Sequence, residues 1–236
     1  VKAEVPALAR TVKVIPYPRP EADDANVPAF NTRAKTLLYV GRVHPEKGLH
    51  LLIDAFTRLP AAVREHWKLV VIGPWESRLG GGGEEYRARL QTAAAGHAKI
   101  ELRGSIFDPA ELEREFRSAR LFIYPSLAEK GETFGLAPLE AMAHGCAVLV
   151  SDLGCFHDFV QEGRTGFIFN HRSGEPAHTL REKIENVLRD EPLLARVAEN
   201  GFAKSQEYRL SSVARQFLQD FEQVIHESHG RRATDR

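Results

Sequence analysis

Short apolar runs alternate with segments of helical periodicity along most of this chain of 236 residues. The runs 36–40 (TLLYV) and 68–72 (KLVVI) are typical of buried strands, and each is followed by a stretch with apolar residues every three or four positions. Such alternation is the pattern of a parallel sheet with crossover helices. The sequence therefore predicts an α/β fold with a doubly wound, Rossmann-like parallel sheet of about six strands and with C-terminal helices.

The predicted elements follow one another in regular order. Strands are predicted at 36–40, 68–72, 99–102, 121–124, 147–150 and 166–169. Helices are predicted from about residue 46 to 59 and at 84–95, 108–119, 134–144, 178–189, 193–204 and 211–227. The helix at 108–119 has a strong start, because Asp108 can cap it and Pro109 suits its first turn. Residues 231–236 are expected to form a frayed polar end.

The chain divides into three expected parts. Prolines and an acidic run between residues 16 and 26 indicate an exposed connection, and residues 11–16 are interpreted as a strand or a linker. We expect a linker or return segment at 1–31, the Rossmann-like sheet domain, which would bind the ligand, at 32–190 and the C-terminal helices at 191–236. The chain begins with Val1 and its only methionine is Met142, which favours a piece of a longer protein.

The charges of the chain balance, with 32 Lys and Arg residues against 32 Asp and Glu residues. A chain without net charge has no field that would attract nucleic acid, so no nucleic-acid partner is expected. An anionic ligand must then be bound by local groups.

Two cysteines, Cys146 and Cys155, lie in or beside apolar runs and lack metal-ligand spacing. We expect buried, reduced thiols in preference to a disulfide. No apolar stretch approaches the roughly 20 residues that span a bilayer, and residues 1–10 lack the apolar run of a signal peptide. These features predict a cytoplasmic protein.

Three loops at predicted strand ends carry residues suited to a phosphorylated ligand, because ligands of open parallel sheets bind beyond the carboxyl ends of the strands. The loop 41–48 places Arg42 and Lys47 beside a helix start whose free amides favour anions, with a turn of solvated charges as the alternative. The loop 103–108 would line a base pocket with Ile106, although a structural turn explains it equally well.

The remaining loop carries Glu132 and Glu140. If the segment were helical throughout, their Cα atoms would lie about 12 Å apart, roughly the separation of the hexose and ribose hydroxyls across a pyrophosphate. The amides of Phe134, Gly135 and Leu136 would face the phosphates, and Gly135 would let the backbone approach closely. The alternative is one glutamate favoured by the helix dipole and one surface glutamate, and spacing alone favours that alternative.

Two longer segments narrow the interpretation. They are YVGRVHPEKGLHLLIDAF at 39–56 and ETFGLAPLEAMAHG at 132–145. Together they resemble the donor domain of family-4 retaining glycosyltransferases, which is one half of a GT-B fold, and the second segment contains the E-x7-E signature of that family. Supporting similarities lie at 71–73, 104–112 and 162–169, and the resemblance covers about residues 12–221 in the order of the family.

The resemblance implies roles for the matching residues. Arg42 and Lys47 would neutralise the diphosphate of a UDP- or GDP-linked sugar. Glu132 would accept hydrogen bonds from the sugar hydroxyls, with a part in catalysis, and Glu140 would bind the ribose hydroxyls. The further donor-binding positions are Gly41, Gly73, Ile106, Phe134, Gly135 and Leu136, of which Gly73 and Ile106 would border the base.

The resemblance also implies a reaction, the transfer of a hexose with retention by front-face displacement within an ion pair. No cofactor and no metal are expected, because Arg, Lys and helix amides take the place of a metal. The acceptor, a glycan, a lipid or a small molecule, would bind to the other, N-terminal Rossmann-like domain of the family, which this chain lacks. Any association with a membrane would come through that domain.

Some positions depart from the family pattern and leave the base open. Residues 17–20 replace an NGVD-like turn, Gly73-Pro74 replaces a fuller glycine motif, and residues 80–83 form a glycine run that we interpret as a flexible turn, since it lacks the GK[ST] of a P-loop. No histidine is assigned to the reaction. His44 is expected to be a solvent-facing loop residue, and His144 a helix-end residue whose cation suits the dipole.

Other functions stay open at this stage. One is a non-catalytic module that binds nucleotide sugars, and another is a different GT-B chemistry, such as sugar-nucleotide epimerisation or phosphorolysis, against which the E-x7-E segment argues. A dehydrogenase is excluded, because no G-x-G-x-x-G follows a strand.

Overall fold

The computed structural model describes residues 14–234, and the side chains of residues 14–226. Its sheet consists of β1 Ala34–Val40, β2 Lys68–Ile72, β3 Ile100–Arg103, β4 Ala119–Tyr124, β5 Ala147–Ser151 and β6 Phe167–Phe169. The helices are α1 Leu49–Thr57, α2 Ala61–Arg64, α3 Gly83–Ala94, α4 Pro109–Ser118, α5 Leu136–Ala143, α6 Pro176–Arg189, α7 Glu191–Ser205 and α8 Leu210–Thr234. The predicted α/β class and the six predicted strands are confirmed.

The strands form one sheet in the order β3-β2-β1-β4-β5-β6, and every neighbouring pair is parallel. Chain order reverses between β1 and β4, because the chain runs outward through β2 and β3 before it returns to β4. The two central strands, β1 and β4, are apolar runs. Such continuous apolar runs are typical of strands that are covered on both faces of the sheet. The crevice of such a sheet lies at the reversal, beyond the carboxyl ends of β1 and β4.

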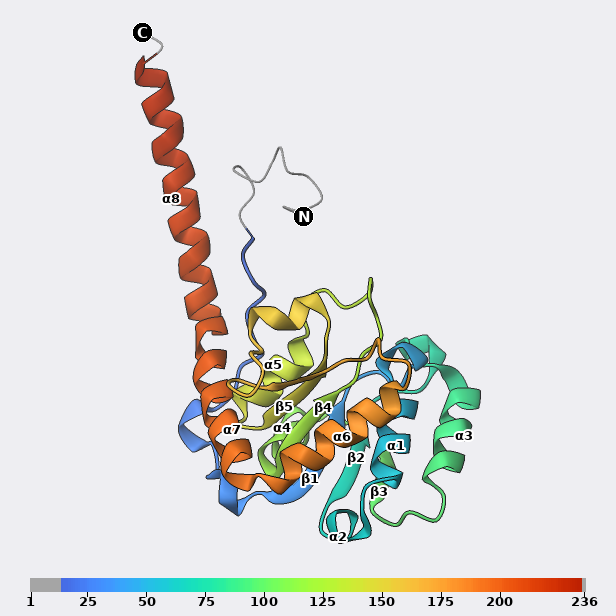
Figure 1. The fold of residues 1–236 in the computed structure, drawn as a ribbon. Helices are drawn as coiled ribbons and strands as arrows, with labels where there is room; N and C mark the ends of the chain where they lie inside the picture. Colours follow the sequence, from blue (N-terminus) through green and yellow to red (C-terminus); the bar gives the residue numbers. More distant parts are fainter. Residues whose placement is uncertain (1–13, 235–236) are drawn as a thin grey trace.

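Helices cover both faces of the sheet (Figure 1). Helix α1 packs against α3 and α6 on one face, whereas α4 packs on β1 and β4, and α7 packs on α5 and β5, on the other. A core of Leu, Ile, Val and Phe side chains fills both layers. Helix α7 therefore belongs to the packed body, and the proposed division of the chain into three parts stays a prediction.

Several predicted boundaries are wrong by a few residues. The first helix does not begin at Glu46, because residues Pro45–Lys47 form a 3-10 turn and Gly48, with φ of 68°, separates that turn from α1. The predicted helix 134–144 begins at Leu136, since Gly135 has a φ of 84°. The last helix continues to Thr234, so residues 231–234 are helical and not a frayed end. Residues 11–13 and 235–236 of the predicted terminal segments lie outside the described residues.

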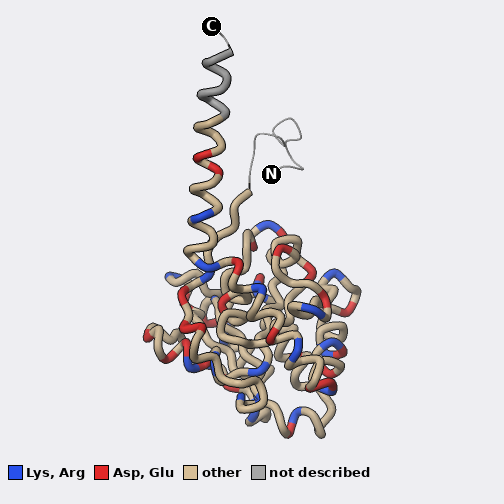
Figure 2. Tube along the Cα trace, turned by 90° about the vertical axis from the view of Figure 1, so that its left-hand side faces the viewer, with Lys and Arg blue, Asp and Glu red and all other residues tan. Residues whose placement is uncertain are grey.

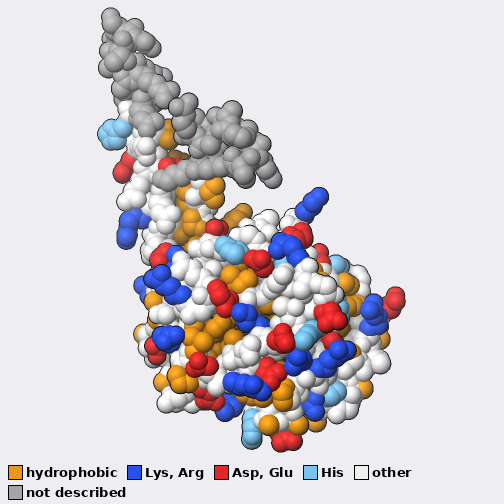
Figure 3. Space-filling model, in the orientation of Figure 1, with side chains coloured by type: hydrophobic (Ala, Val, Ile, Leu, Met, Phe, Trp, Pro, Cys, Tyr) orange, Lys and Arg blue, Asp and Glu red, His pale blue; other side chains and the backbone are white. Residues whose placement is uncertain are grey.

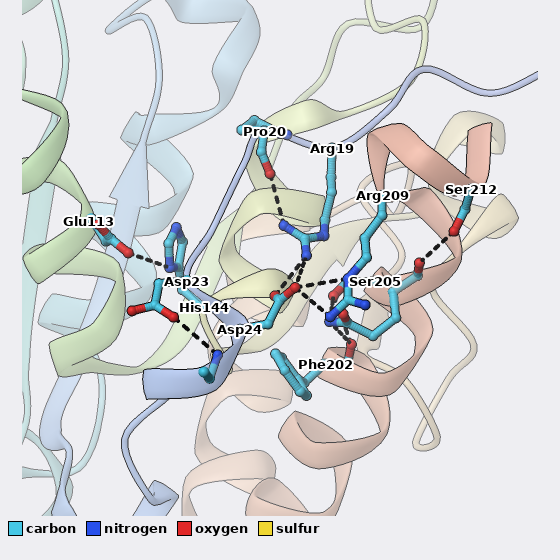
Figure 4. A network of polar contacts seen from close by, with 12 residues as sticks. Arg19, Pro20, Asp23, Asp24, Glu113, His144, Phe202, Ser205, Arg209 and Ser212 are labelled. Carbon is cyan, nitrogen blue, oxygen red and sulfur yellow. Dashed lines mark hydrogen bonds and ion pairs between the residues drawn. The ribbon is translucent and has the colours of Figure 1, made fainter. Parts of the chain in front are cut away.

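One carboxylate anchors both the incoming segment and the last helix (Figure 4). Arg19 donates two hydrogen bonds from Nη2 to Asp24, at 2.7 and 2.6 Å, and Arg209 donates from Nε to the same carboxylate at 2.8 Å. The Arg19 amide also donates to the Tyr208 carbonyl at 2.7 Å. Arg19 is 5% exposed, and buried ion pairs with this hydrogen bonding hold their partners in one geometry.

Helix α8 rises from the body past the upper edge of the sheet in Figure 1. Its part with described side chains, residues 210–226, carries exposed apolar side chains, at Leu210, Phe217, Leu218, Phe221, Val224 and Ile225, and apolar atoms are visible on it in Figure 3. Elsewhere in the described part of the chain, Lys and Arg residues alternate with Asp and Glu residues along the trace (Figure 2), and their side chains are interspersed on the face drawn in Figure 3. The balanced composition is thus also a locally mixed surface.

Candidate functional site

The loop after β1 holds its two cationic side chains in different ways. Lys47 is buried, with 6% of its side chain exposed, and its Nζ lies 2.7 Å from Oε2 of Glu132. Arg42 is 44% exposed and lies 2.7 Å from Oε1 of Glu46. The Glu46 carboxylate also lies 3.8 Å from the Lys47 ammonium. Arg42, Lys47 and Glu132, three residues predicted to act together, are thus brought into one cluster at the crossover of the sheet.

Glu132 lies in the loop between β4 and α5. Its side chain is 11% exposed, and Oε2 accepts a hydrogen bond from Oγ of Ser126 at 3.0 Å as well as the one from Lys47. Ser126 lies two residues after the end of β4, so the carboxyl end of that strand supplies both the loop and a partner for its glutamate. Lys47 and Ser126 therefore hold one oxygen of a nearly buried carboxylate, and Tyr124 also forms a hydrogen bond with this carboxylate.

Two stacked tyrosines form the floor beneath these charges. The rings of Tyr39 and Tyr124 lie 5.6 Å apart and nearly parallel, and the Lys47 ammonium lies 5.6 Å from the Tyr124 centroid. The Tyr39 hydroxyl donates to the Arg42 carbonyl at 2.8 Å. Burial, and after it the charges of neighbouring acidic and phenolic groups, raises the pKa of both tyrosines well above the ordinary value. Both are therefore neutral hydroxyls at physiological pH.

The start of α5 presents free backbone amides to the same edge. Helix N-termini leave their first amides without intrahelical partners, and no side chain caps α5. Within the described residues, the amides of Gly135, Leu136 and Ala137 donate to no protein acceptor. Because these amides and the helix dipole favour negative charge, this helix start can bind phosphate oxygens.

Phe134 faces inward, and only its backbone is available to a ligand. Its side chain is 7% exposed and packs on Phe159 and Tyr208, at 5.8 Å between ring centroids in both cases, and on Tyr17 at 6.0 Å. Leu136 is 44% exposed at the first turn of α5. Of the two predicted positions, only Leu136 offers an accessible side chain.

Glu140 lies within α5, and its carboxyl is mostly removed from water. Burial alone raises the pKa of Glu140 to about 7, with no charge or hydrogen-bond partner among the described side chains contributing. A buried carboxyl without a protein partner has capacity for ligand hydroxyls. The predicted spacing of about 12 Å assumed a helix from Glu132, and this assumption is wrong because the helix begins only at Leu136. Among the described side chains, Glu140 and Glu132 share no hydrogen bond or ion pair.

An open, mainly apolar pocket of about 300 Å³ lies at the carboxyl ends of β1, β2 and β3. Three predicted donor-binding residues, Gly41, Gly73 and Ile106, line it together with Arg42. The exposed side chains of Leu79 and Phe107 form part of its wall. A flat aromatic base fits such a pocket, because apolar walls favour burial of its ring faces.

The glycine run is ordered by backbone hydrogen bonds. The amide of Gly82 donates to the Val43 carbonyl at 2.8 Å, and that of Gly83 to the Trp75 carbonyl at 2.7 Å. Arg42 donates from Nη1 to the Gly80 carbonyl at 2.9 Å. Residues 80–83 therefore form a defined turn that supports Arg42 and packs on the loop after β1, which the predicted flexible turn did not anticipate.

The two histidines singled out in the sequence have different environments. His44 caps the 3-10 turn, with Nδ1 accepting from the Glu46 amide at 3.3 Å. His144 is 2% exposed and stacks on Phe116 at 5.4 Å between centroids. Burial lowers the pKa of His144 to about 4, so the ring is neutral near pH 7. The predicted cation at this helix end is wrong, because it would have to be buried.

The remaining candidates for chemistry are the two cysteines and groups of metal-ligating side chains. Both cysteines are free; Cys146 is buried as expected, whereas Cys155 is only half-buried. Among the described residues, no group of three or more His, Cys, Asp or Glu side chains could hold a metal ion. No helix in the described part combines the length and the apolar character that crossing a bilayer requires. Independence of metals and a cytoplasmic setting stay predictions.

The sequence did not reveal the partners of the predicted residues. Ser126, Glu46 and Tyr124 contact or surround Lys47 and Glu132, and Cys155 lies close enough for Glu132 to raise its pKa. Only Ser126 carried a signal, because it lies two residues after a recognisable strand. The others depend on which loops the topology brings together.

The fold and the cluster define an α/β domain with a candidate anion-binding site at the crossover of a parallel sheet. A comparison with protein families is more specific, since the family described as "Glycosyl transferases group 1" matches residues 21–204, well over half of the chain. The chain belongs to this family. Its sheet and C-terminal helices resemble a domain of GT-B glycosyltransferases.

Curated relatives are longer than this chain. It is similar to lipopolysaccharide 1,2-N-acetylglucosaminetransferase of Salmonella typhimurium, with 38% identity over 135 residues, which are 57% of this chain and 34% of that protein. It is also similar to phosphatidyl-myo-inositol mannosyltransferase of Mycobacterium tuberculosis, with 30% identity over 207 residues, which are 86% of this chain and 51% of that protein. The chain thus spans between a third and about half of the length of these two relatives.

Solved structures show the same fold. Sucrose-phosphate synthase of Thermosynechococcus elongatus superposes with a TM-score of 0.71 at 26% identity, over 95% of this chain and 57% of the other. HepE of Anabaena, solved with UDP and glucose, superposes with a TM-score of 0.66 at 22% identity, over 81% of this chain and 49% of the other. The comparisons lend no support to the binding-module or epimerase alternatives.

Proposed function

We propose that this chain is the donor-binding part of a family-4 retaining glycosyltransferase and binds a UDP- or GDP-linked hexose. The observation that carries the proposal is the buried Lys47–Glu132 pair, 2.7 Å between Nζ and Oε2, beside free amides at the start of α5. A cation and helix amides suit a diphosphate, while a supported carboxylate suits sugar hydroxyls. Both lie at the crossover of the sheet, where open α/β sheets bind nucleotides.

The relatives support this ligand class. Both relatives named above are called sugar transferases, and the HepE structure contains UDP and glucose. In this chain, the 300 Å³ pocket beside Gly41, Gly73 and Ile106 accommodates the base, and Glu140 accepts hydrogen bonds from the ribose hydroxyls. Glu132 accepts hydrogen bonds from the hydroxyls of the hexose.

The charges of the site favour departure of the nucleotide. When the bond between sugar C1 and the diphosphate oxygen breaks, both electrons stay with that oxygen, and negative charge grows on the diphosphate. Lys47 has three donor hydrogens and uses one on Glu132, so it can donate to the leaving oxygen without releasing its partner. Arg42 and the amides of Gly135 and Leu136 complete the stabilisation.

Retention follows if the acceptor hydroxyl attacks from the face that the diphosphate leaves. The acceptor oxygen then forms the new bond to C1, and its proton passes to the departing diphosphate. Glu132 lies at the sugar but orients hydroxyls and does not form a covalent bond to it. The transfer needs no metal in this proposal, because Arg42, Lys47 and the amides of α5 supply the positive charge.

The acceptor, a glycan, a lipid or a small molecule, is proposed to bind outside the region that the relatives share with this chain. The relatives extend well beyond the matched region, and an N-terminal domain would provide that surface. The reaction is placed in the cytoplasm, and contact with a membrane, if it occurs, is placed on the acceptor side.

Calorimetric titration of the chain with UDP and with GDP tests the proposal. Arg42→Ala and Glu140→Ala should each weaken binding about tenfold or more, because hydrogen bonds to charged groups contribute roughly 1.5–3 kcal/mol. Arg58→Ala is the matched control, since Arg58 is an exposed arginine at the far end of α1 that pairs with Asp54. It should bind like the unaltered chain.

Failure of the unaltered chain to bind either nucleoside diphosphate would contradict the proposal. An equal loss in Arg58→Ala and Arg42→Ala would contradict the assignment of the site, because it would mean that general charge, and not the loop after β1, attracts the nucleotide.

A further inference from the structure

The loop that carries Glu132 has a second acidic residue, Glu129, which is held by residues after β6. Nε2 of His171 lies 2.9 Å from Oε1 of Glu129. Arg172 lies 2.8 Å from the same oxygen through Nε, and its Nη2 donates to Oε2 at 2.8 Å. One carboxylate thus receives a bidentate guanidinium and an imidazole. We call Glu129, His171 and Arg172 the loop clamp.

Arg172 also connects the clamp to the end of β5. Its Nη1 donates to the Asp152 carbonyl at 2.7 Å, and the Asp152 carboxylate lies 2.7 Å from Nε2 of His157. The clamp therefore ties together the segments that follow β4, β5 and β6 at the upper edge of the sheet in Figure 1. Among the described residues, no member of this network forms an ion pair with Arg42 or Lys47, which are predicted to neutralise the diphosphate.

The other flank of the same loop is tied to the segment after β1. The Leu127 amide donates to the Glu46 carbonyl at 2.7 Å, and Lys47 pairs with Glu132. Next to these anchors the loop makes a tight turn, in which the Glu132 amide donates to the Ala128 carbonyl at 3.2 Å. The position of Glu132 is therefore set by two anchors that precede it in the chain: Leu127 is tied to the segment after β1, and Glu129 to the segment after β6.

The Glu129 and Arg172 side chains are half exposed, and the clamp differs from an ordinary surface ion pair by its fork geometry and its buried imidazole. Exposed pairs usually contribute little, since two mobile side chains must be ordered in water. Here the His171 side chain is 3% exposed, and the Arg172 fork is bidentate. The hydrogen bonds from Arg172 and His171 lower the pKa of Glu129, which keeps this carboxylate charged.

We infer that Glu129, His171 and Arg172 are positioning residues that set the place of Glu132 and so govern binding of the sugar part of the donor. The inference rests on the proposed function. The clamp lies on the β5–β6 side of the loop, whereas Arg42 and the base pocket lie on the β1–β3 side. Loss of the clamp should therefore weaken binding of the hexose and leave binding of the nucleoside diphosphate unchanged.

Two pairs of ligands separate these effects. Dissociation constants are measured by calorimetry for UDP against UDP-glucose and for GDP against GDP-mannose, and the pair that the chain binds is used. For Arg172→Ala and for Glu129→Gln, affinity for the nucleotide sugar should fall about tenfold, as small misplacements of positioned groups can cost up to about a hundredfold. Affinity for the nucleoside diphosphate should stay within about twofold.

Arg189→Ala is the matched control, because Arg189 is an exposed arginine that pairs only with Glu185 on its own helix. A double-mutant cycle with Glu132→Gln then tests whether the clamp acts through Glu132. In the Glu132→Gln background, Arg172→Ala should cause no further loss of sugar affinity. Thermal unfolding of each variant shows whether it is folded, and Glu129→Gln keeps the size of the side chain if Arg172→Ala does not fold.

Three results would overturn the inference while leaving the proposed function intact. They are unchanged sugar affinity in both clamp variants, equal losses for nucleoside diphosphate and nucleotide sugar, and a full loss from Arg172→Ala in the Glu132→Gln background. Absence of any nucleotide binding by the unaltered chain would overturn the proposed function and the inference together.

Discussion

At the scale of single residues, the carboxyl of Glu140 has the most unusual environment in the site. Burial raises its pKa to about 7, and no described side chain offsets the burial. In the unfolded chain the group has an ordinary pKa, so the folded state binds its proton more tightly. The stabilisation from that proton is complete below the unfolded pKa and is lost as pH rises through about 7.

Glu140→Gln should therefore be more stable than the unaltered chain above pH 7 and nearly equal to it near pH 4.5. The difference at high pH should be on the order of 2 kcal/mol, since each pKa unit corresponds to about 1.4 kcal/mol. Urea unfolding at both pH values measures it. Glu182→Gln is the control, because Glu182 is an exposed glutamate on α6.

If the difference in stability between Glu140→Gln and the unaltered chain were the same at pH 4.5 and above pH 7, the buried environment of Glu140 would be contradicted. The pH dependence of nucleotide binding gives a second test of this environment. Ribose hydroxyls that donate to the ionised carboxylate should lower its pKa, so affinity should rise as pH increases through about 7.

Single residues at strand ends could be predicted from the sequence, but their partners could not. Arg42 and Lys47 follow a recognisable strand, and Glu132 precedes a recognisable helix, so chain position alone indicated their edge of the sheet. The Lys47–Glu132 pair joins residues 85 positions apart, and local patterns carry no information about such a contact. The charge of His144 was mispredicted, because burial of that helix end depends on packing against Phe116.

At the scale of elements, the start of α5 depends on Gly135. Its φ is 84°, and a Cβ at this position would lie 2.4 Å from Cε1 of the buried Phe156. The amides proposed to bind the phosphates therefore owe their direction to a residue without a side chain. Sequence periodicity extended this helix to Phe134, since Gly135 follows an apolar residue and does not interrupt the pattern.

Gly135→Ala should destabilise the fold by about 1–3 kcal/mol, because it adds both backbone strain and a clash in the core. Gly174→Ala is the matched control, since a Cβ there meets nothing within 4 Å. Urea unfolding checks both variants. Equal stability of the Gly135 and Gly174 variants would contradict the described start of α5.

At the scale of the whole molecule, the alternation of strands and helices predicted the parallel sheet and its layers. The strand order was not predicted, because the order in which strands pair depends on crossovers between distant segments. That order places the ends of β1 and β4 side by side, and with them Arg42, Lys47 and Glu132. The length of α8 was underestimated, since the polar sequence after Glu227 has no periodic apolar residues that would indicate a helix.

The central claim is that the carboxyl edge of the sheet at this crossover binds a nucleoside diphosphate. Amide chemical shifts of the nitrogen-15-labelled chain, measured during titration with UDP and GDP, test it most directly. The account predicts that one of these ligands shifts the amides of Gly41, Gly73, Ile106 and Leu136, which lie at the pocket or the α5 start. Unchanged shifts with both ligands, or changes confined to the Arg19–Arg209 side of the molecule, would contradict it.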